Sequence, residues 1–419
     1  MGIKRIGGGM AVNQITEGVI WKQLLYFFFP ILFGTFFQQL YNTADAVIVG
    51  QFVGTQALAA VGGATGSLIN FFVNLFVGLA SGTTVVIAQA YGAHDAESVG
   101  GTVHTSVALA LAAGLGLTAV GVAAAPWALS AMGTPADIMD FALIYLRVYM
   151  LGTIPSFLYN VGSGILRAVG DTRRPLVCLA VAGVINVVLN LLFVIVFQMS
   201  VAGVALATIL SQTVSAIMVT VLLVREEGAM HLDLRHLGFH KKALLQIIQI
   251  GLPAGLQSTV FSLSNVVIQS AINSFGSTVV AGNSAASNLE GFIYTGMNAF
   301  AQAAVTFTSQ NVGARRYDNL DRVMRNCLLC VTVAGLFLGC GAYFGGEVLL
   351  HFYSTDEAVV AAGLSRMQII CTAYFLCGIM DTLASCLRGR GYSVIPMIVS
   401  LVGSCLLRVV WIATIFRMF

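Results

Sequence analysis

Charged residues are scarce in this chain. Asp, Glu, Lys and Arg make up 9% of its 419 residues, whereas a soluble globular protein carries about 25%. So little charge cannot cover an ordinary water-exposed surface, which excludes a typical soluble domain. Hydrophobic residues make up 58% of the chain. They form continuous runs long enough to cross a bilayer, which takes about 20 residues of helix.

These runs also lack the alternation of polar and apolar residues that marks the strands of an outer-membrane barrel. Because only helices and closed barrels satisfy the backbone inside lipid, we predict an all-α membrane protein. It should be a multi-pass protein of the cell (inner) membrane. The eleven expected spans lie near residues 22–49, 57–88, 98–125, 136–160, 175–198, 201–224, 243–272, 279–310, 323–345, 357–386 and 394–416.

Lys and Arg are absent from every second loop. The loops without them cover residues 50–56, 126–135, 198–201, 273–278 and 346–356. Sixteen of the 20 basic residues lie at the N-terminus or in the opposite loops. This asymmetry follows the positive-inside rule and predicts a cytoplasmic N-terminus. Membrane topology therefore accounts for the basic loops, and no nucleic-acid partner is expected.

The residue patterns of catalysis are missing as well. Ser, His and Asp do not cluster as a nucleophilic triad would, and no Gly-rich loop carries a phosphate-binding Lys. Cys327 and Cys330 have the spacing of paired metal ligands, but no second pair or nearby His accompanies them. We interpret them as small helix-packing residues. The sequence therefore predicts neither an enzyme nor a tightly bound cofactor.

Two parts of the chain repeat one another. Leu166–Gly170 recurs as Leu387–Gly391, and subtracting 167 from 388 gives a displacement of 221 residues. The same displacement places Gln89 on Gln310, and each Gln begins a Gln-x-x-Gly-Ala sequence. This is an internal duplication, which is common among alternating-access transporters.

We expect the two copies to form two lobes. Residues 1–224 form the N-terminal lobe with six spans, residues 225–242 a cytoplasmic linker, and residues 243–419 the C-terminal lobe with five. An even number of spans in the first copy gives the second the same orientation, so a pseudo-two-fold axis should run along the membrane normal. Pro30 and Pro253 match in the first helix of each copy and are predicted hinges, with a static kink as the alternative.

A carboxylate is expected at membrane depth on the first helix. Asp45 has no Lys or Arg within helical reach in the sequence. Such a group takes up a proton or holds a cation, because a bare anion is costly there. Either behaviour suits an ion-coupled transporter. The alternative is a carboxylate near the outer interface, solvated by water.

A second polar cluster falls on the fifth and sixth spans. Asn186 and Asn190 are four residues apart and share one helix face, while Thr208 follows on the sixth span and Tyr145 lies on the fourth. Their oxygens suit Na⁺, or a hydrogen-bond network around a titrating carboxyl. The alternative is that the two Asn side chains only hydrogen-bond across helices.

Other polar residues are candidates to line a cleft and bind an organic cation. For Asp381, a structural partnership with Arg366 or Arg408 is the alternative. The predicted cavity residues are Gln38, Gln39, Asn42, Asn265, Gln269, Glu290 and Asp381, and Gln257 and Asn273 raise the same question.

Several motifs resemble the multidrug and toxic compound extrusion (MATE) family. They are Thr16–Leu24, Phe37–Gly50, Gly54–Gly62 and Ile165–Arg173 with its second-copy partner. The resemblance runs from about residue 15 to the end. It is closest to the bacterial and archaeal branch that has a cation site in the N-terminal lobe.

The resemblance implies a cation site made by Asp45, Asn186 and Thr208, with Tyr145 in support. The family's second carboxylate would fall at Asn190, which leaves Asp45 to couple alone. Proton coupling is therefore favoured over Na⁺, with Asp45 as the possible Na⁺ ligand. Family members have twelve spans, so the second copy is expected to lack its last helix.

The leading hypothesis is a monomeric, cation-coupled antiporter. It would export amphipathic or cationic drugs and toxic metabolites by alternating access. One alternative is a lipid-linked oligosaccharide flippase of the same superfamily, which would need basic residues such as Arg147, Arg366 and Arg408 in its cleft. Another is a truncated, non-transporting membrane protein.

Overall fold

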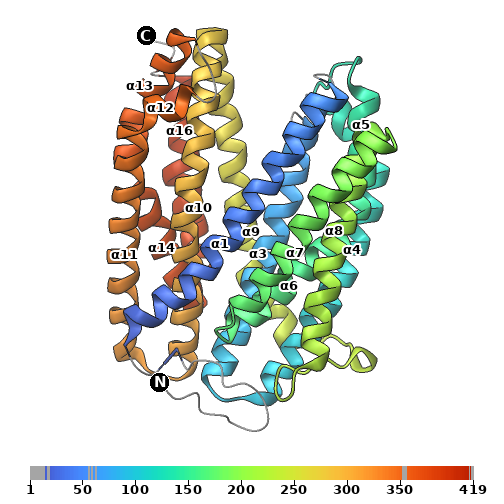
Figure 1. Ribbon diagram of the computed structural model, residues 1–419. Helices are drawn as coiled ribbons and strands as arrows, with labels where there is room; N and C mark the ends of the chain where they lie inside the picture. Colours follow the sequence, from blue (N-terminus) through green and yellow to red (C-terminus); the bar gives the residue numbers. More distant parts are fainter. Residues whose placement is uncertain are drawn as a thin grey trace. The chain divides into compact units, whose positions relative to one another are not determined.

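A computed structural model describes residues 15–16, 19–54, 57, 60–61, 64–351, 356–414 and 416. Over these residues the chain is built from helices and contains no strand (Figure 1). The all-α prediction is confirmed. Thr355, which entered the comparison of the two copies, lies outside the described residues.

The chain divides into two compact units. Unit 1 holds Phe33–Gly255, and unit 2 holds Ile15–Leu32 with the described part of Leu256–Phe419. Each unit thus takes most of one sequence copy. The early parts of α1 and α9 are the exception, because each belongs to the unit of the other copy.

Unit 1 is a bundle in which α6 packs against α3, α4 and α8 (Figure 1). Its elements are α1 from residue 33 (α1 spans Ile20–Ile48), η1 (Val49–Val53), α3 (Ala64–Gly92), α4 (Ala96–Ala131), α5 (Met139–Leu151), α6 (Thr153–Ala168), α7 (Arg173–Leu191), η2 (Leu192–Val196), α8 (Ser200–Arg225), η3 (Leu234–His236) and α9 to residue 255 (α9 spans Lys241–Ile272).

Unit 2 centres on α10, which packs against α11, α13 and α14. Its further elements are η4 (Asn273–Phe275), α10 (Ser277–Gly313), α11 (Tyr317–Phe344), α12 (Gly346–His351), α13 (Glu357–Ala373), α14 (Phe375–Gly389), α15 (Val394–Ser400), η5 (Leu401–Leu406) and α16 (Leu407–Ala413).

Different side chains make corresponding contacts in the two units. In unit 2 the rings of Phe28 and Phe300 stack with centroids 3.9 Å apart, which packs the start of α1 on α10. In unit 1 the start of α9 meets α3 through glycines, and a Cβ added to Gly82 would lie 2.5 Å from the Ile247 carbonyl oxygen. Only glycine permits so close an approach of two backbones.

The passage between units falls just after each predicted hinge. Pro30 lies inside α1, and the unit changes between Leu32 and Phe33. Pro253 lies inside α9, and the unit changes after Gly255. A proline removes one helical hydrogen bond and weakens the helix locally. Each helix is therefore softened close to where it leaves one packed body for the other.

Eight of the described helices are long and apolar enough to cross a membrane, or ten if each bent pair counts as one span. The bent pairs are α5 with α6, at 48°, and α13 with α14, at 43°. The helix α10 coincides with another of the eleven expected spans but is more polar and is not among the ten. The chain is a multi-pass membrane protein.

The duplication recurs in local backbone geometry. His94 and Arg315, 221 residues apart, have φ angles of 57° and 55°. Gly170 and Gly391, at the same separation, have φ angles of 98° and 95°. Left-handed residues of this kind are rare outside glycine. Corresponding turns in the two copies therefore have corresponding backbone conformations.

Candidate functional site

The candidate ion site begins at the end of α1. Asp45 lies four residues before η1, where the winding widens to a π-helix at Val49. Helix α7 widens in the same way at Leu192, two residues after Asn190. Segments η1 and η2 contact each other. Local π-helical winding is frequent at functional sites, since it redirects the side chains beside it.

Asp45 is joined directly to α7. The Nδ2 of Asn190 donates a hydrogen bond to Oδ1 of Asp45 at 2.5 Å, and its distance to Oδ1 of Asn186 is 3.3 Å. Asn186 is 1% exposed and Asn190 is fully buried. No Lys or Arg among the described residues forms an ion pair with Asp45. Amide groups are therefore its closest polar partners.

Two further helices complete the surroundings of this carboxyl. Thr208 of α8 lies beside it, and the hydroxyl of Thr208 donates to the Val204 carbonyl at 3.0 Å. On α5, Tyr145 and Tyr149 both interact electrostatically with Asp45, and their ring centroids are 6.1 Å apart. Tyr145 is buried. The five residues of the predicted ion site thus lie around one carboxyl in unit 1.

Sequence reasoning did not select Tyr149 or Tyr41, which also interact with Asp45. Tyr149 lies one turn after Tyr145, so the four-residue spacing was an available signal. Tyr41 is buried, one turn before Asp45 on α1. The same spacing would have identified it.

The donor set suits a small cation or a proton. Oδ1 of Asn190 and Nδ2 of Asn186 are buried without a hydrogen-bond partner. A buried acceptor left unpaired costs about 1–3 kcal/mol. The carboxylate of Asp45, the amide oxygen of Asn190 and the hydroxyl of Thr208 are hard oxygen donors. They could hold Na⁺, or the amides could surround a protonated Asp45.

The predicted cavity residues of α1 are mostly accessible. Gln38 and Asn42 are exposed, and Gln39 is half-buried. Gln38 interacts with the Tyr41 hydroxyl. The backbone carbonyl of Gln39 accepts a hydrogen bond from Thr43 at 2.9 Å. These three residues lie on the part of α1 that leads to Asp45.

The predicted cavity residues of unit 2 have protein partners. Asn265 accepts a hydrogen bond from Arg408 at 3.1 Å, and Gln269 accepts one from Asn283 at 3.1 Å. Glu290 forms a two-pronged ion pair with Arg366. The open anion that sequence reasoning expected at Glu290 is therefore already neutralised.

Asp381 does not pair with either arginine that was considered for it, because Arg366 contacts Glu290 and Arg408 contacts Asn265. It interacts instead with Tyr294 and Arg388. The Nη2 of Arg388 also donates to Gln257 at 3.2 Å. Asp381 thus belongs to a polar network of its own.

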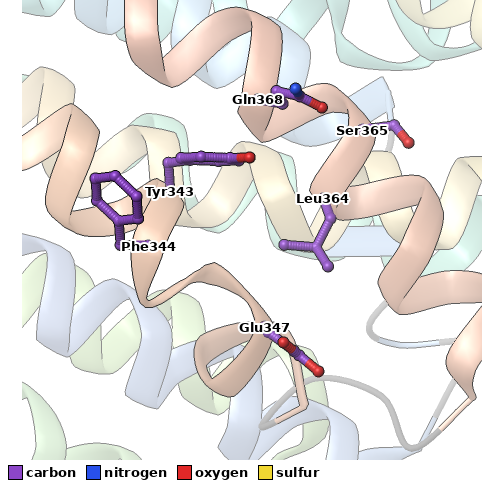
Figure 2. Close-up of a pocket in the computed structure, with 6 residues that line it drawn as sticks. All are labelled: Tyr343, Phe344, Glu347, Leu364, Ser365 and Gln368. Atoms are coloured by element: carbon purple, nitrogen blue, oxygen red, sulfur yellow. The ribbon is translucent and has the colours of Figure 1, made fainter.

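A separate surface pocket of about 340 Å³ lies where α11, α12 and α13 meet in unit 2. Figure 2 shows the rings at the end of α11 on one side, Leu364 of α13 on the other, and Glu347 of α12 at the edge. Aromatic walls with one carboxylate favour amphipathic cations. The lining residues are Tyr343, Phe344, Glu347, Leu364, Ser365 and Gln368, none of which sequence reasoning selected.

Comparison with known proteins decides the family. The sequence profile of the MatE family matches residues 30–192 and 253–414, so each copy gives one match and the matches begin at Pro30 and Pro253. The chain belongs to the MatE family. Its members are transporters, so this protein is a transporter and not an enzyme, as predicted.

Curated relatives of this MatE protein include two from bacteria. The probable multidrug resistance protein YpnP of Bacillus subtilis is 27% identical over 399 residues, covering 95% of this chain and 89% of the relative. The probable multidrug resistance protein NorM of Streptococcus pneumoniae is 28% identical, covering 90% and 84%.

A solved MOP superfamily transporter from Pyrococcus furiosus has a matching fold. Its TM-score is 0.90 at 23% identity, covering 98% of this chain and 92% of that one.

Proposed function

We propose that this MatE protein is a cation-coupled antiporter that exports amphipathic or cationic small molecules. Two relatives carry multidrug resistance in their names. The observation that carries the proposal is Asp45, which is held by Asn190 at 2.5 Å without a basic partner. A carboxylate of this kind can bind and release a cation, which coupling requires.

Proton coupling is favoured over Na⁺. The amide of Asn190 stands where a second carboxylate would be, so Asp45 is the one acidic group at the site. A proton needs a single carboxylate oxygen. A Na⁺ ion needs several oxygens and gains less from one negative charge than from two. The partners of Asp45 therefore suit protonation better.

Exchange follows from linkage between two conformations. If the cation stabilises one state and the exported compound the other, each lowers the apparent affinity of the other. Pro30 weakens α1 fifteen residues before Asp45, in the helix that connects the two units. Bending at Pro30 would therefore alter the surroundings of Asp45. We place the N-terminus in the cytoplasm and the protein in the inner membrane.

The flippase alternative has less support. A lipid pyrophosphate would need free basic side chains, and two of the three candidates are engaged. Arg366 binds Glu290, and Arg408 donates to Asn265.

Replacing Asp45 with Asn tests the proposal. The variant keeps the shape of the side chain but cannot bind a proton or balance a cation, so ion-driven efflux of ethidium should fall at least tenfold. Efflux is measured as dye fluorescence in inverted membrane vesicles with an imposed proton or Na⁺ gradient. Asp137→Asn, at an exposed position, is the matched control and should transport normally. Undiminished efflux by Asp45→Asn would refute the assignment.

A further inference from the structure

Unit 2 contains a buried carboxylate of its own. Glu290 on α10 is 5% exposed. Its two oxygens accept from Arg366 of α13, Oε1 from Nε at 2.8 Å and Oε2 from Nη2 at 2.7 Å. The remaining terminal nitrogen of Arg366 donates to Oδ1 of Asn283 at 2.5 Å. Asn283 in turn donates to Gln269 on α9 at 3.1 Å. Both carboxylate oxygens of Glu290 are therefore bound by a cation.

The fold brings these groups together through a close helix crossing. A Cβ added to Gly282 on α10 would lie 2.5 Å from the Val359 carbonyl and 2.8 Å from the Gly363 nitrogen of α13. Asn283 follows Gly282 directly, and Arg366 lies one turn after Gly363. The backbones meet only because both positions are glycine. The ion pair is thus held beside a rigid contact.

The duplication links this network to the ion site of unit 1. At displacements of 221 and 222 residues, Arg366 corresponds to Tyr145, Glu290 to Ile69 and Asn283 to Val61. In unit 1 these three counterparts, Tyr145, Ile69 and Val61, pack in one cluster. The two trios therefore occupy corresponding places in the two units.

Charge is distributed differently at these corresponding places. In unit 1 the carboxyl near Tyr145 is Asp45, from α1, and it has no basic partner. In unit 2 the counterpart of Asp45 on α9 is Val267 or Ile268. The carboxyl comes instead from α10 and has Arg366 beside it. One copy thus has a carboxyl that is open to a mobile cation, and the other has a carboxyl with a built-in cation.

We propose that Glu290 is a latent second site for a small monovalent cation, H⁺ or Na⁺, and that Arg366 fills it as a tethered cation. Guanidinium stays protonated throughout the physiological range, so the site neither takes up nor releases an ion during transport. Unit 1 alone then exchanges a mobile ion. The binding claim stands apart from the proposed transport function, although its consequence for coupling rests on that function.

The other titratable groups that face this pair do not replace the arginine. Cys371 on α13 and Tyr374, between α13 and α14, interact with both Glu290 and Arg366. Both are neutral when protonated and cannot act as a counter-cation. Removing the charge of Arg366 would therefore leave Glu290 to bind a proton or Na⁺, because an unpaired buried charge is unstable.

The test counts ions bound by the purified full-length protein in detergent. Proton uptake is measured by a pH indicator after an acid pulse, and Na⁺ by radioactive ²²Na⁺ binding. Arg366→Gln should bind one more ion per chain than wild type, and the assay that detects it identifies the ion. Arg366→Gln combined with Glu290→Gln should lose the extra ion. Arg366→Lys keeps a tethered charge and should gain none.

Two further arms isolate the proposal. In an Asp45→Asn background, Arg366→Gln should still gain one ion, even if Asp45 has no role in coupling. Glu290→Gln alone should leave the number of bound ions at the wild-type value. A folded Arg366→Gln protein, judged by gel filtration, with no extra ion would overturn the proposal. So would a loss of one ion in Glu290→Gln, which needs no change at Arg366.

Discussion

Replacing Asn190 with Asp would place a second carboxylate against Asp45. The Nδ2 atom of Asn190 lies 2.5 Å from Oδ1 of Asp45, so the new oxygen would lie close to an existing one. Two unit charges 4 Å apart repel by about 4 kcal/mol at an effective dielectric constant of 20. A bound cation relieves this repulsion. The variant also loses the hydrogen bond that Asn190 donates to Asp45.

The size of the effect follows from that repulsion. About 1.4 kcal/mol corresponds to a factor of ten in affinity, so complete relief would strengthen Na⁺ binding by roughly a thousandfold. Competition from protons and partial solvation reduce this gain. We therefore expect Asn190→Asp to bind Na⁺ at least tenfold more tightly than wild type at neutral pH.

The assay is ²²Na⁺ binding to purified protein, with Na⁺-driven ethidium efflux in vesicles alongside. Asn288→Asp is the matched control, since it adds the same charge at an exposed position of α10. It should leave Na⁺ affinity unchanged. The reasoning is refuted if a folded Asn190→Asp protein has the Na⁺ affinity of wild type, because Asn190 would then not contribute to an ion site with Asp45.

Three further changes test the hinge, the packing and a helix cap. Pro30→Ala restores a helical hydrogen bond to α1; efflux should fall several-fold while the melting temperature does not, and equal efflux would argue for a static kink. Gly82→Ala forces two backbones apart and should lower stability by about 1–3 kcal/mol in thermal melts, whereas Gly116→Ala has open space and should not. Asp95 caps α4 by accepting from Ser98, and these hydrogen bonds hold the pKa of Asp95 below its usual value. Its contribution is therefore complete at neutral pH and disappears as the pH falls through the lowered pKa, so Asp95→Ala should melt earlier than wild type at pH 7 but not in strong acid.

The residues of the candidate ion site were identifiable from the sequence because membrane-depth polar groups are few. Asp45 lies in an apolar run, and Asn186 and Asn190 share one helix face. Spacing within a helix determines which side chains face the same way. It does not determine which helices meet, so the hydrogen bond from Asn190 to Asp45 required the tertiary structure.

The partner of Glu290 shows the same limit more sharply. Glu290 and Arg366 are separated by 76 residues, and sequence reasoning considered Asp381 as the partner of Arg366. Three acidic or amide groups in the second copy were equally plausible. The close contact of Gly282 with α13 selects one of them, and no local pattern reveals which glycines meet.

The sequence by itself determined the class of protein, the helices, the duplication and the family, because these depend on composition, on periodicity and on repeated local motifs. Only the tertiary structure decided how the early parts of α1 and α9 are assigned to units, and which carboxylate has a cation. In unit 2 two phenylalanines pack α1 on α10, and in unit 1 glycines pack α9 on α3. Such contacts depend on the shapes of side chains that meet across hundreds of residues, which a one-dimensional pattern does not encode.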